Sequence, residues 1–163
     1  MLRYWKVFVF VLVLASGMAY AVEEGEKAPD FSLLNLSQEK VRLSDYQGKV
    51  IILDFWATRC PPCVKEIPHF VELQREWADK GVQIIGTSLD RQGELNMLKA
   101  FVKEYEINYP ILLYDEITLK KYSPIKFIPT TFVIDKEGKI YKKYIGYREK
   151  KIFEEDIKKL VGR

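Results

Sequence analysis

The sequence has few metal-binding side chains and no strong excess of charge. Its 163 residues include only two cysteines and one histidine, and 26 basic side chains stand against 23 acidic ones. A structural zinc site needs about four ligands, so we expect no metal and no cofactor. The near balance of charge argues against nucleic acid as the partner, and two of the basic residues lie within the first 21.

Long apolar runs are also scarce, and the main one opens the chain. Two basic residues precede an apolar run over residues 7–15, and the small-residue motif Ala19-Tyr20-Ala21 follows. This pattern is typical of an export signal. An uncleaved anchor is the alternative, but the 16 residues 7–22 are shorter than the ~20 that span a bilayer. We expect residues 1–21 to be a signal peptide or an N-terminal membrane anchor, and residues 22–163 to be a periplasmic or otherwise extracytoplasmic domain.

The rest of the chain alternates between strand and helix patterns. Residues 50–56 form an apolar run with the length of a strand buried on both faces, and only Asp54 interrupts it. In residues 61–80 the apolar spacing becomes helical. Further strands are predicted at residues 31–36, 40–43, 82–88, 111–114, 128–135 and 140–145, and helices at residues 94–106, 117–122 and 149–161. This order predicts an α/β fold with a mixed central sheet and helices on both faces.

Both cysteines lie between the strand at residues 50–56 and the helix that follows it. A C-x-x-C pair can bind metal, cross-link a loop or exchange disulfides. A purely structural disulfide would close too short a loop to restrain the unfolded chain, so redox exchange is favoured. Cys60 is expected at the helix N-cap with Pro61 at the first helical position, where the positive helix end favours the Cys60 thiolate. Cys63, further inside, is expected to be the shielded, resolving thiol.

The surrounding motifs resemble the thioredoxin fold. They are Asp54-Phe55-Trp56-Ala57-Thr58, the C-x-x-C pair, Glu66-x-Pro68 and Ile128-Pro129-Thr130-Thr131-Phe132. Residues 25–163 resemble more narrowly the exported TlpA/ResA-type thiol-disulfide oxidoreductases. That resemblance implies a thioredoxin-like sheet with an N-terminal β-hairpin and an added α-β insertion. It also implies that Pro129 is cis and lies against the cysteines, and that Trp56, Ile128 and Pro129 bind substrate.

The resemblance also implies roles for two acids. Asp54 stands where thioredoxins carry a buried carboxylate, whose raised pKa suits it to take the proton from Cys63. The alternative for Asp54 is a polar residue satisfied near the end of its strand. Glu66 resembles the acid that this subfamily places at its active site, where it would raise the pKa of the thiols or relay protons. Its alternative is an ordinary solvated helix residue.

Two residues depart from the family pattern close to the cysteines. Arg59 replaces the tryptophan usual before the first cysteine, and Phe127 stands where glycine is common. Both border the place where a partner would dock. Arg59 would favour the thiolate of Cys60, or else it simply faces solvent.

The sequence therefore predicts a monomeric, exported reductase of disulfides in substrate proteins. Cys60 attacks the substrate, Cys63 resolves the mixed disulfide, and an upstream membrane thiol donor restores the dithiol. By resemblance, one expected substrate is apocytochrome c. A disulfide-forming oxidase, a peroxiredoxin-like peroxidase and a copper-handling binding module stay open as alternatives. The peroxidase would need a proline where this chain has Leu53 and a threonine or serine where it has Ala57. The copper module would prefer a wider cysteine spacing and a distal histidine.

Overall fold

Seven strands of the described residues form one mixed sheet in the order β2-β1-β5-β4-β3-β6-β7. The computed structural model describes residues 22–122 and 124–162, so the predicted leader at residues 1–21 lies outside the described residues. The strands are β1 (Ser32–Asn35), β2 (Lys40–Arg42), β3 (Val50–Trp56), β4 (Val82–Ser88), β5 (Ile111–Leu113), β6 (Thr130–Ile134) and β7 (Ile140–Ile145). The helices are α1 (Pro61–Trp77), α2 (Leu95–Glu104), α3 (Glu116–Lys121) and α4 (Lys150–Val161), with 3-10 turns η1 (Leu43–Tyr46), η2 (Ala78–Lys80) and η3 (Gln92–Glu94).

Strand β3 lies near the middle of the sheet and is buried along its whole length. It pairs in parallel with β4 and antiparallel with β6, so both of its edges are hydrogen-bonded. The near-continuous apolar sequence of β3 is explained by this position, because each of its faces is covered. The prediction of a doubly buried strand is confirmed.

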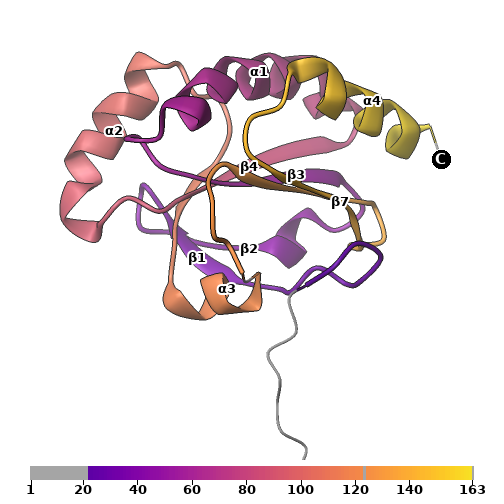
Figure 1. Cartoon of the computed structure of the whole chain (residues 1–163), viewed down its shortest axis with the longest axis horizontal. Coiled ribbons are helices and arrows are strands. Elements are labelled where there is room, and N and C mark those ends of the chain that lie inside the picture. Colours follow the sequence, from indigo (N-terminus) through magenta and orange to yellow (C-terminus); the bar gives the residue numbers. More distant parts are fainter. Residues whose placement is uncertain (1–21, 123, 163) are drawn as a thin grey trace, which may run out of the picture.

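The two faces of β3 belong to two separate hydrophobic clusters. Val50, Ile52 and Trp56 pack with residues of α1, α2 and α4, whereas the alternate residues pack with the N-terminal segment and Tyr122. Figure 1 shows the corresponding layers, with α1, α2 and α4 on one side of the sheet and α3 on the other. Side chains alternate along a strand, so Asp54 lies on the face covered by α1.

Most predicted elements have ends that differ by a few residues in the structure, and three of these differences have a clear local cause. The helix predicted to reach residue 80 is α-helical only to Trp77, and η2 completes it before Gly81, whose φ is +82°. Glu94 accepts a hydrogen bond from the Arg91 amide in η3, so α2 begins one residue later. Strand β6 begins at Thr130 because Pro129 has no N–H to pair.

No helix within residues 22–122 and 124–162 is both long enough and apolar enough to cross a membrane.

Gly86 should be intolerant of a side chain, because the sheet packs tightly there. A Cβ at this position would lie 2.7 Å from Ile111 Cδ1 and 2.8 Å from Trp56 Nε1. We expect Gly86→Ala to lower the free energy of unfolding by about 1 to 3 kcal/mol through overpacking. Urea denaturation followed by circular dichroism measures the change. Gly93→Ala is the matched control, since its Cβ would meet nothing within 4 Å, and an equal loss in both variants would contradict the packing argument.

Candidate active site

Cys60 and Cys63 form a disulfide at the N-terminus of α1. Cys60 is the N-cap, and its sulfur accepts a hydrogen bond from the Cys63 amide at 3.3 Å. Pro61 and Pro62 have no amide hydrogen, so Cys63 supplies the first helical N–H that can reach this sulfur. Cys60 is 8% exposed and Cys63 1%. Cys60 is therefore the more exposed of the two cysteines, although both residues are buried in the disulfide form.

The segment before β6 lies directly against the disulfide. The Ile128–Pro129 peptide bond is cis, as the resemblance implied, and Cys60 Sγ lies 3.5 Å from the Ile128 carbonyl oxygen. The Gly146 amide donates to the Pro129 carbonyl at 2.7 Å, and the Thr130 hydroxyl donates to the Phe127 carbonyl at 2.6 Å. These bonds fix the segment beside Cys60 and leave the Phe127 side chain 68% exposed.

Asp54 is buried behind the cysteine pair. Its Oδ1 accepts a hydrogen bond from the Thr131 hydroxyl at 3.0 Å, across the β3–β6 pairing. Burial raises the pKa of Asp54 well above its ordinary value, and the Thr131 hydrogen bond only partly opposes this effect. A carboxyl group of this kind is suited to exchange a proton near neutral pH.

Glu66 is fully buried on α1, one turn after Cys63. The Arg148 amide donates to its Oε1 at 2.7 Å, while its buried Oε2 has no hydrogen-bond partner. Burial raises the pKa of Glu66, and the negative charge of Asp54 raises it further. The alternative of a solvated helix residue does not describe Glu66 in this structure.

Tyr109 was not singled out by the sequence, yet it shares the surroundings of both acids. Burial raises the pKa of its phenol, and the charges of Asp54 and Glu66 add to the effect. Its ring packs edge-on against Phe70 of α1. The sequence just before β5 contains no motif that would indicate that the Tyr109 hydroxyl lies near two carboxyl groups.

Trp56 lies beneath the site and does not form its surface. It is 1% exposed and packs against Phe101 of α2, with ring centroids 5.6 Å apart. A direct contact between this ring and a substrate is therefore not available in the disulfide form. Trp56 instead packs in the core at the end of β3 and so helps to hold the turn that carries Cys60.

Two further acids hold that turn, and the sequence reasoning missed both. Asp90 accepts hydrogen bonds from the Thr58 amide at 3.0 Å and the Thr58 hydroxyl at 2.7 Å, and Glu94 accepts one from Arg59 at 2.6 Å. Arg59 thus turns toward Glu94, in an ion pair whose arginine is largely exposed. The available signal was the position of Asp90 just after β4, because polar residues at the carboxyl end of a parallel strand often belong to a site.

The AhpC/TSA family model matches residues 24–143 of the chain. The chain belongs to the AhpC/TSA family. It is 37% identical over 139 residues to the thiol-disulfide oxidoreductase ResA of Bacillus thuringiensis subsp. konkukian, covering 85% of this chain and 79% of the relative. It is 32% identical to the thioredoxin-like protein YneN of Bacillus subtilis, covering 96% and 98%. A solved thiol:disulfide interchange protein of the thioredoxin family from Chlorobium tepidum superposes with a TM-score of 0.78 at 30% identity, covering 88% and 100%.

Within the AhpC/TSA family, these relatives make the chain a thiol-disulfide oxidoreductase with the thioredoxin fold. The predicted fold class, including the N-terminal hairpin and the added helix and strand, is confirmed. The redox C-x-x-C pair is present as expected, with its disulfide closed.

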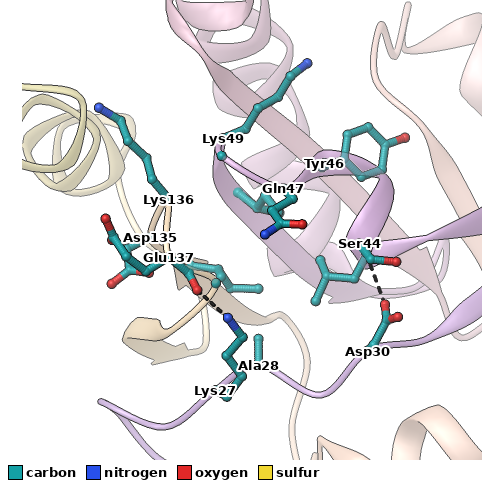
Figure 2. Close-up of a pocket in the computed structure, with 15 residues that line it drawn as sticks. Lys27, Ala28, Asp30, Ser44, Tyr46, Gln47, Lys49, Asp135, Lys136 and Glu137 are labelled. Carbon is teal, nitrogen blue, oxygen red and sulfur yellow. Dashed lines mark hydrogen bonds between the residues drawn. The ribbon is translucent and has the colours of Figure 1, made fainter.

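A pocket of about 200 Å³ lies at the end of the sheet where β3 begins, opposite the end that leads to the disulfide. Figure 2 shows residues that line it. Lys49 and Ile51 line it at the start of β3, and Ile134 and Asp135 line it at the end of β6, whereas Cys60 follows the far end of β3. Its lining contains no cysteine. No cluster of three or more histidine, cysteine or acidic side chains able to hold a metal occurs in the described part of this AhpC/TSA protein.

The raised pKa of Asp54 makes a prediction about stability. The folded protein binds the Asp54 proton more tightly than the unfolded chain does, so this group costs stability as pH rises above its ordinary value of 3.8. We expect Asp54→Asn to gain stability relative to wild type between about pH 5 and pH 8, by roughly 1.4 kcal/mol for each pH unit from pH 5 up to the raised pKa of about 7. Urea unfolding of the disulfide form at both pH values measures it.

Glu104→Gln, in an exposed acid of α2, is the control for this measurement. A stability difference between Asp54→Asn and wild type that is the same at pH 5 and pH 8 would show that Asp54 does not titrate abnormally.

Proposed function

We propose that the protein is an exported reductase of protein disulfides, with Cys60 as the attacking thiol and Cys63 as the resolving thiol. The observation that carries the proposal is the burial of Asp54 and Glu66 in the layer behind the disulfide. A strong disulfide oxidant needs a reduced form that is stabilised, usually as a thiolate. Negative charge behind the cysteines works against a thiolate, which favours the reductase direction.

The start of α1 supports the same direction. A helix N-terminus stabilises a thiolate through its free amides and its dipole. Pro61 and Pro62 remove two of these amides, and the Cys63 amide is the remaining donor to the Cys60 sulfur. Cys60 therefore keeps enough support to react as a nucleophile, without the strong thiolate stabilisation that an oxidase uses.

In the proposed reaction, the Cys60 thiolate attacks one sulfur of the substrate disulfide, and the other substrate sulfur leaves with the electron pair. Cys63 then loses its proton to Asp54 and attacks Cys60. The Cys60–Cys63 bond forms, the bond from Cys60 to the substrate breaks, and the substrate dithiol is released. A two-electron thiol donor must reduce the Cys60–Cys63 disulfide before the next cycle. In this proposal Ile128 and Pro129 align an extended substrate beside Cys60, and the 3.5 Å distance from Cys60 Sγ to the Ile128 carbonyl oxygen supports that role.

For partners, we propose disulfide-bearing substrate proteins, with the haem-binding C-x-x-C-H pair of apocytochrome c among them, and a membrane thiol carrier as the donor. This part of the proposal is supported by the resemblance to TlpA/ResA-type proteins and by the leader pattern in residues 1–21. We further propose that the protein works as a monomer in an extracytoplasmic compartment, either after signal cleavage or on an N-terminal anchor.

The reduction potential tests the direction of exchange. Equilibration of the purified protein with glutathione or dithiothreitol buffers should give a potential near that of thioredoxin, about −270 mV. A value near that of DsbA, about −120 mV, would overturn the reductase assignment and favour the oxidase alternative. Peroxide consumption by the reduced protein, measured in parallel, would favour the peroxidase instead.

Trapping tests the two cysteine roles and identifies substrates. Cys63→Ser should retain partner proteins on Cys60 as mixed disulfides, because the resolving thiol is gone. Non-reducing electrophoresis and mass spectrometry of the native compartment would show these adducts. The matched control is the double variant Cys60→Ser/Cys63→Ser, which should retain none. Adducts on Cys63 in a Cys60→Ser variant, in place of adducts on Cys60, would reverse the assigned roles.

A further inference from the structure

Two exposed side chains of different chemistry lie beside Cys60, and the proposed reaction steps use neither of them. Arg59 directly precedes Cys60, and its side chain is 69% exposed. Phe127 lies two residues before the cis Pro129, in the segment whose Ile128 carbonyl oxygen is 3.5 Å from Cys60 Sγ. A partner protein whose sulfur reaches Cys60 therefore meets both side chains.

Phe127 is the most exposed large apolar residue in the described part of the chain, at 68%. The next residue, Ile128, packs partly against the cluster that α1 covers, whereas Phe127 belongs to neither cluster. The Thr130 hydroxyl donates to the Phe127 carbonyl at 2.6 Å, and the Gly146 amide donates to the Pro129 carbonyl at 2.7 Å. A single exposed apolar residue is common, but this one is held beside the disulfide, so a bound substrate gains free energy by covering its ring.

The exposed charges around Cys60 are all positive. The turn before α1, the loop after β4 and the segment before β6 together expose three charged side chains, which are Arg59, Arg91 and Lys126. The acids of the same segments are turned inward, since Asp90 is 8% exposed and the Glu94 side chain is 22% exposed. A surface of this kind attracts an acidic partner segment and repels a basic one.

Glu94 orients the Arg59 guanidinium and leaves donors available on it. Arg59 Nη2 donates to Glu94 Oε1 at 2.6 Å. The other Glu94 oxygen accepts a hydrogen bond from the Arg91 amide at 3.2 Å, so this acid is itself held in place. A guanidinium carries five N–H donors in a planar fork, and Arg59 can therefore bind a second carboxylate without leaving Glu94.

We propose that these exposed residues select substrate segments that carry an acidic side chain and a large apolar side chain near the reactive cysteine. Arg59 binds the acid, Arg91 and Lys126 add to the attraction, and Phe127 packs against the apolar side chain. The inference rests on the proposed function, because it names the class of substrate that reaches Cys60.

Peptides that differ only in charge test the role of the cations. Each peptide carries one cysteine in a mixed disulfide with 2-thiopyridine, with glutamate, glutamine or lysine close to it. The Cys60 thiolate attacks the peptide sulfur, and pyridine-2-thione leaves with the electron pair and gives the colour that is measured. At low ionic strength, the reduced protein should react about five- to tenfold faster with the glutamate peptide than with the lysine peptide, and added salt should shrink this ratio.

Arg59→Gln should lower the glutamate-to-lysine ratio to about two- to threefold, because the other two cations remain. Arg42→Gln is the matched control, since Arg42 is an arginine of β2 that is 64% exposed and pairs with Asp45. It should leave the ratio unchanged. Each ratio is taken within one variant, so any change in the reactivity of Cys60 itself cancels.

A second pair of peptides, with leucine or serine near the cysteine, tests Phe127. Wild type should react about fivefold faster with the leucine peptide, because this side chain is buried against the ring. Phe127→Ala should react with both peptides at nearly equal rates. Ile117→Ala is the control, because Ile117 is 66% exposed on α3, and it should keep the full preference for leucine.

Equal rates for the glutamate and lysine peptides in wild type would overturn the proposal, and so would a ratio that Arg59→Gln does not change. Reduction of hydroxyethyl disulfide, which is small and uncharged, separates this outcome from failure of the proposed function. A protein that reduces it without any preference among the peptides refutes only the selection of substrates. A protein that reduces neither this compound nor any peptide refutes the proposed function, and the selection with it.

Discussion

The site depends on the complete burial of β3 between two layers. Because both faces of this strand are covered and both of its edges are paired, its last residues hold the turn at residues 57–60 at a fixed point beyond the carboxyl end of the strand. The same burial removes water from Asp54, and that is what raises the pKa of its carboxyl group. One constraint thus positions the Cys60 sulfur and raises the pKa of the acid that we propose as its partner's proton acceptor.

Around the disulfide, opposing electrostatic effects meet. The N-terminus of α1 favours a negative sulfur at Cys60, whereas the buried acids behind the pair disfavour one. The two prolines weaken the first effect by removing amides, and the added Glu66 strengthens the second. Together these effects leave the Cys60 thiolate only moderately stabilised. Cys60 can then attack a disulfide without the strong thiolate stabilisation of an oxidase, and this is the basis of the proposed reductase direction.

The turn that carries Cys60 is also held from outside the C-x-x-C motif. Asp90, after β4, binds Thr58 through its amide and hydroxyl, and Glu94 binds Arg59. These acids come from the segment that leads into α2. The chain immediately before Cys60 is therefore anchored by a part of the fold far from it in sequence, while the Ile128–Pro129 segment lies against Cys60 on another side.

The sequence by itself determined the order of the strands and helices, the burial of β3, the N-cap position of Cys60 and the thioredoxin-type family, because these features depend on local patterns of apolar spacing, proline and cysteine. It also indicated Asp54 and Glu66 as separate acids. Only the tertiary structure decided that both lie in one dry layer, that Arg148 offers Glu66 an amide, and that Trp56 supports the site from below. Such contacts join residues up to about 80 positions apart, and the spacing of residues along a chain carries no signal for side chains that meet only when helix and sheet pack together.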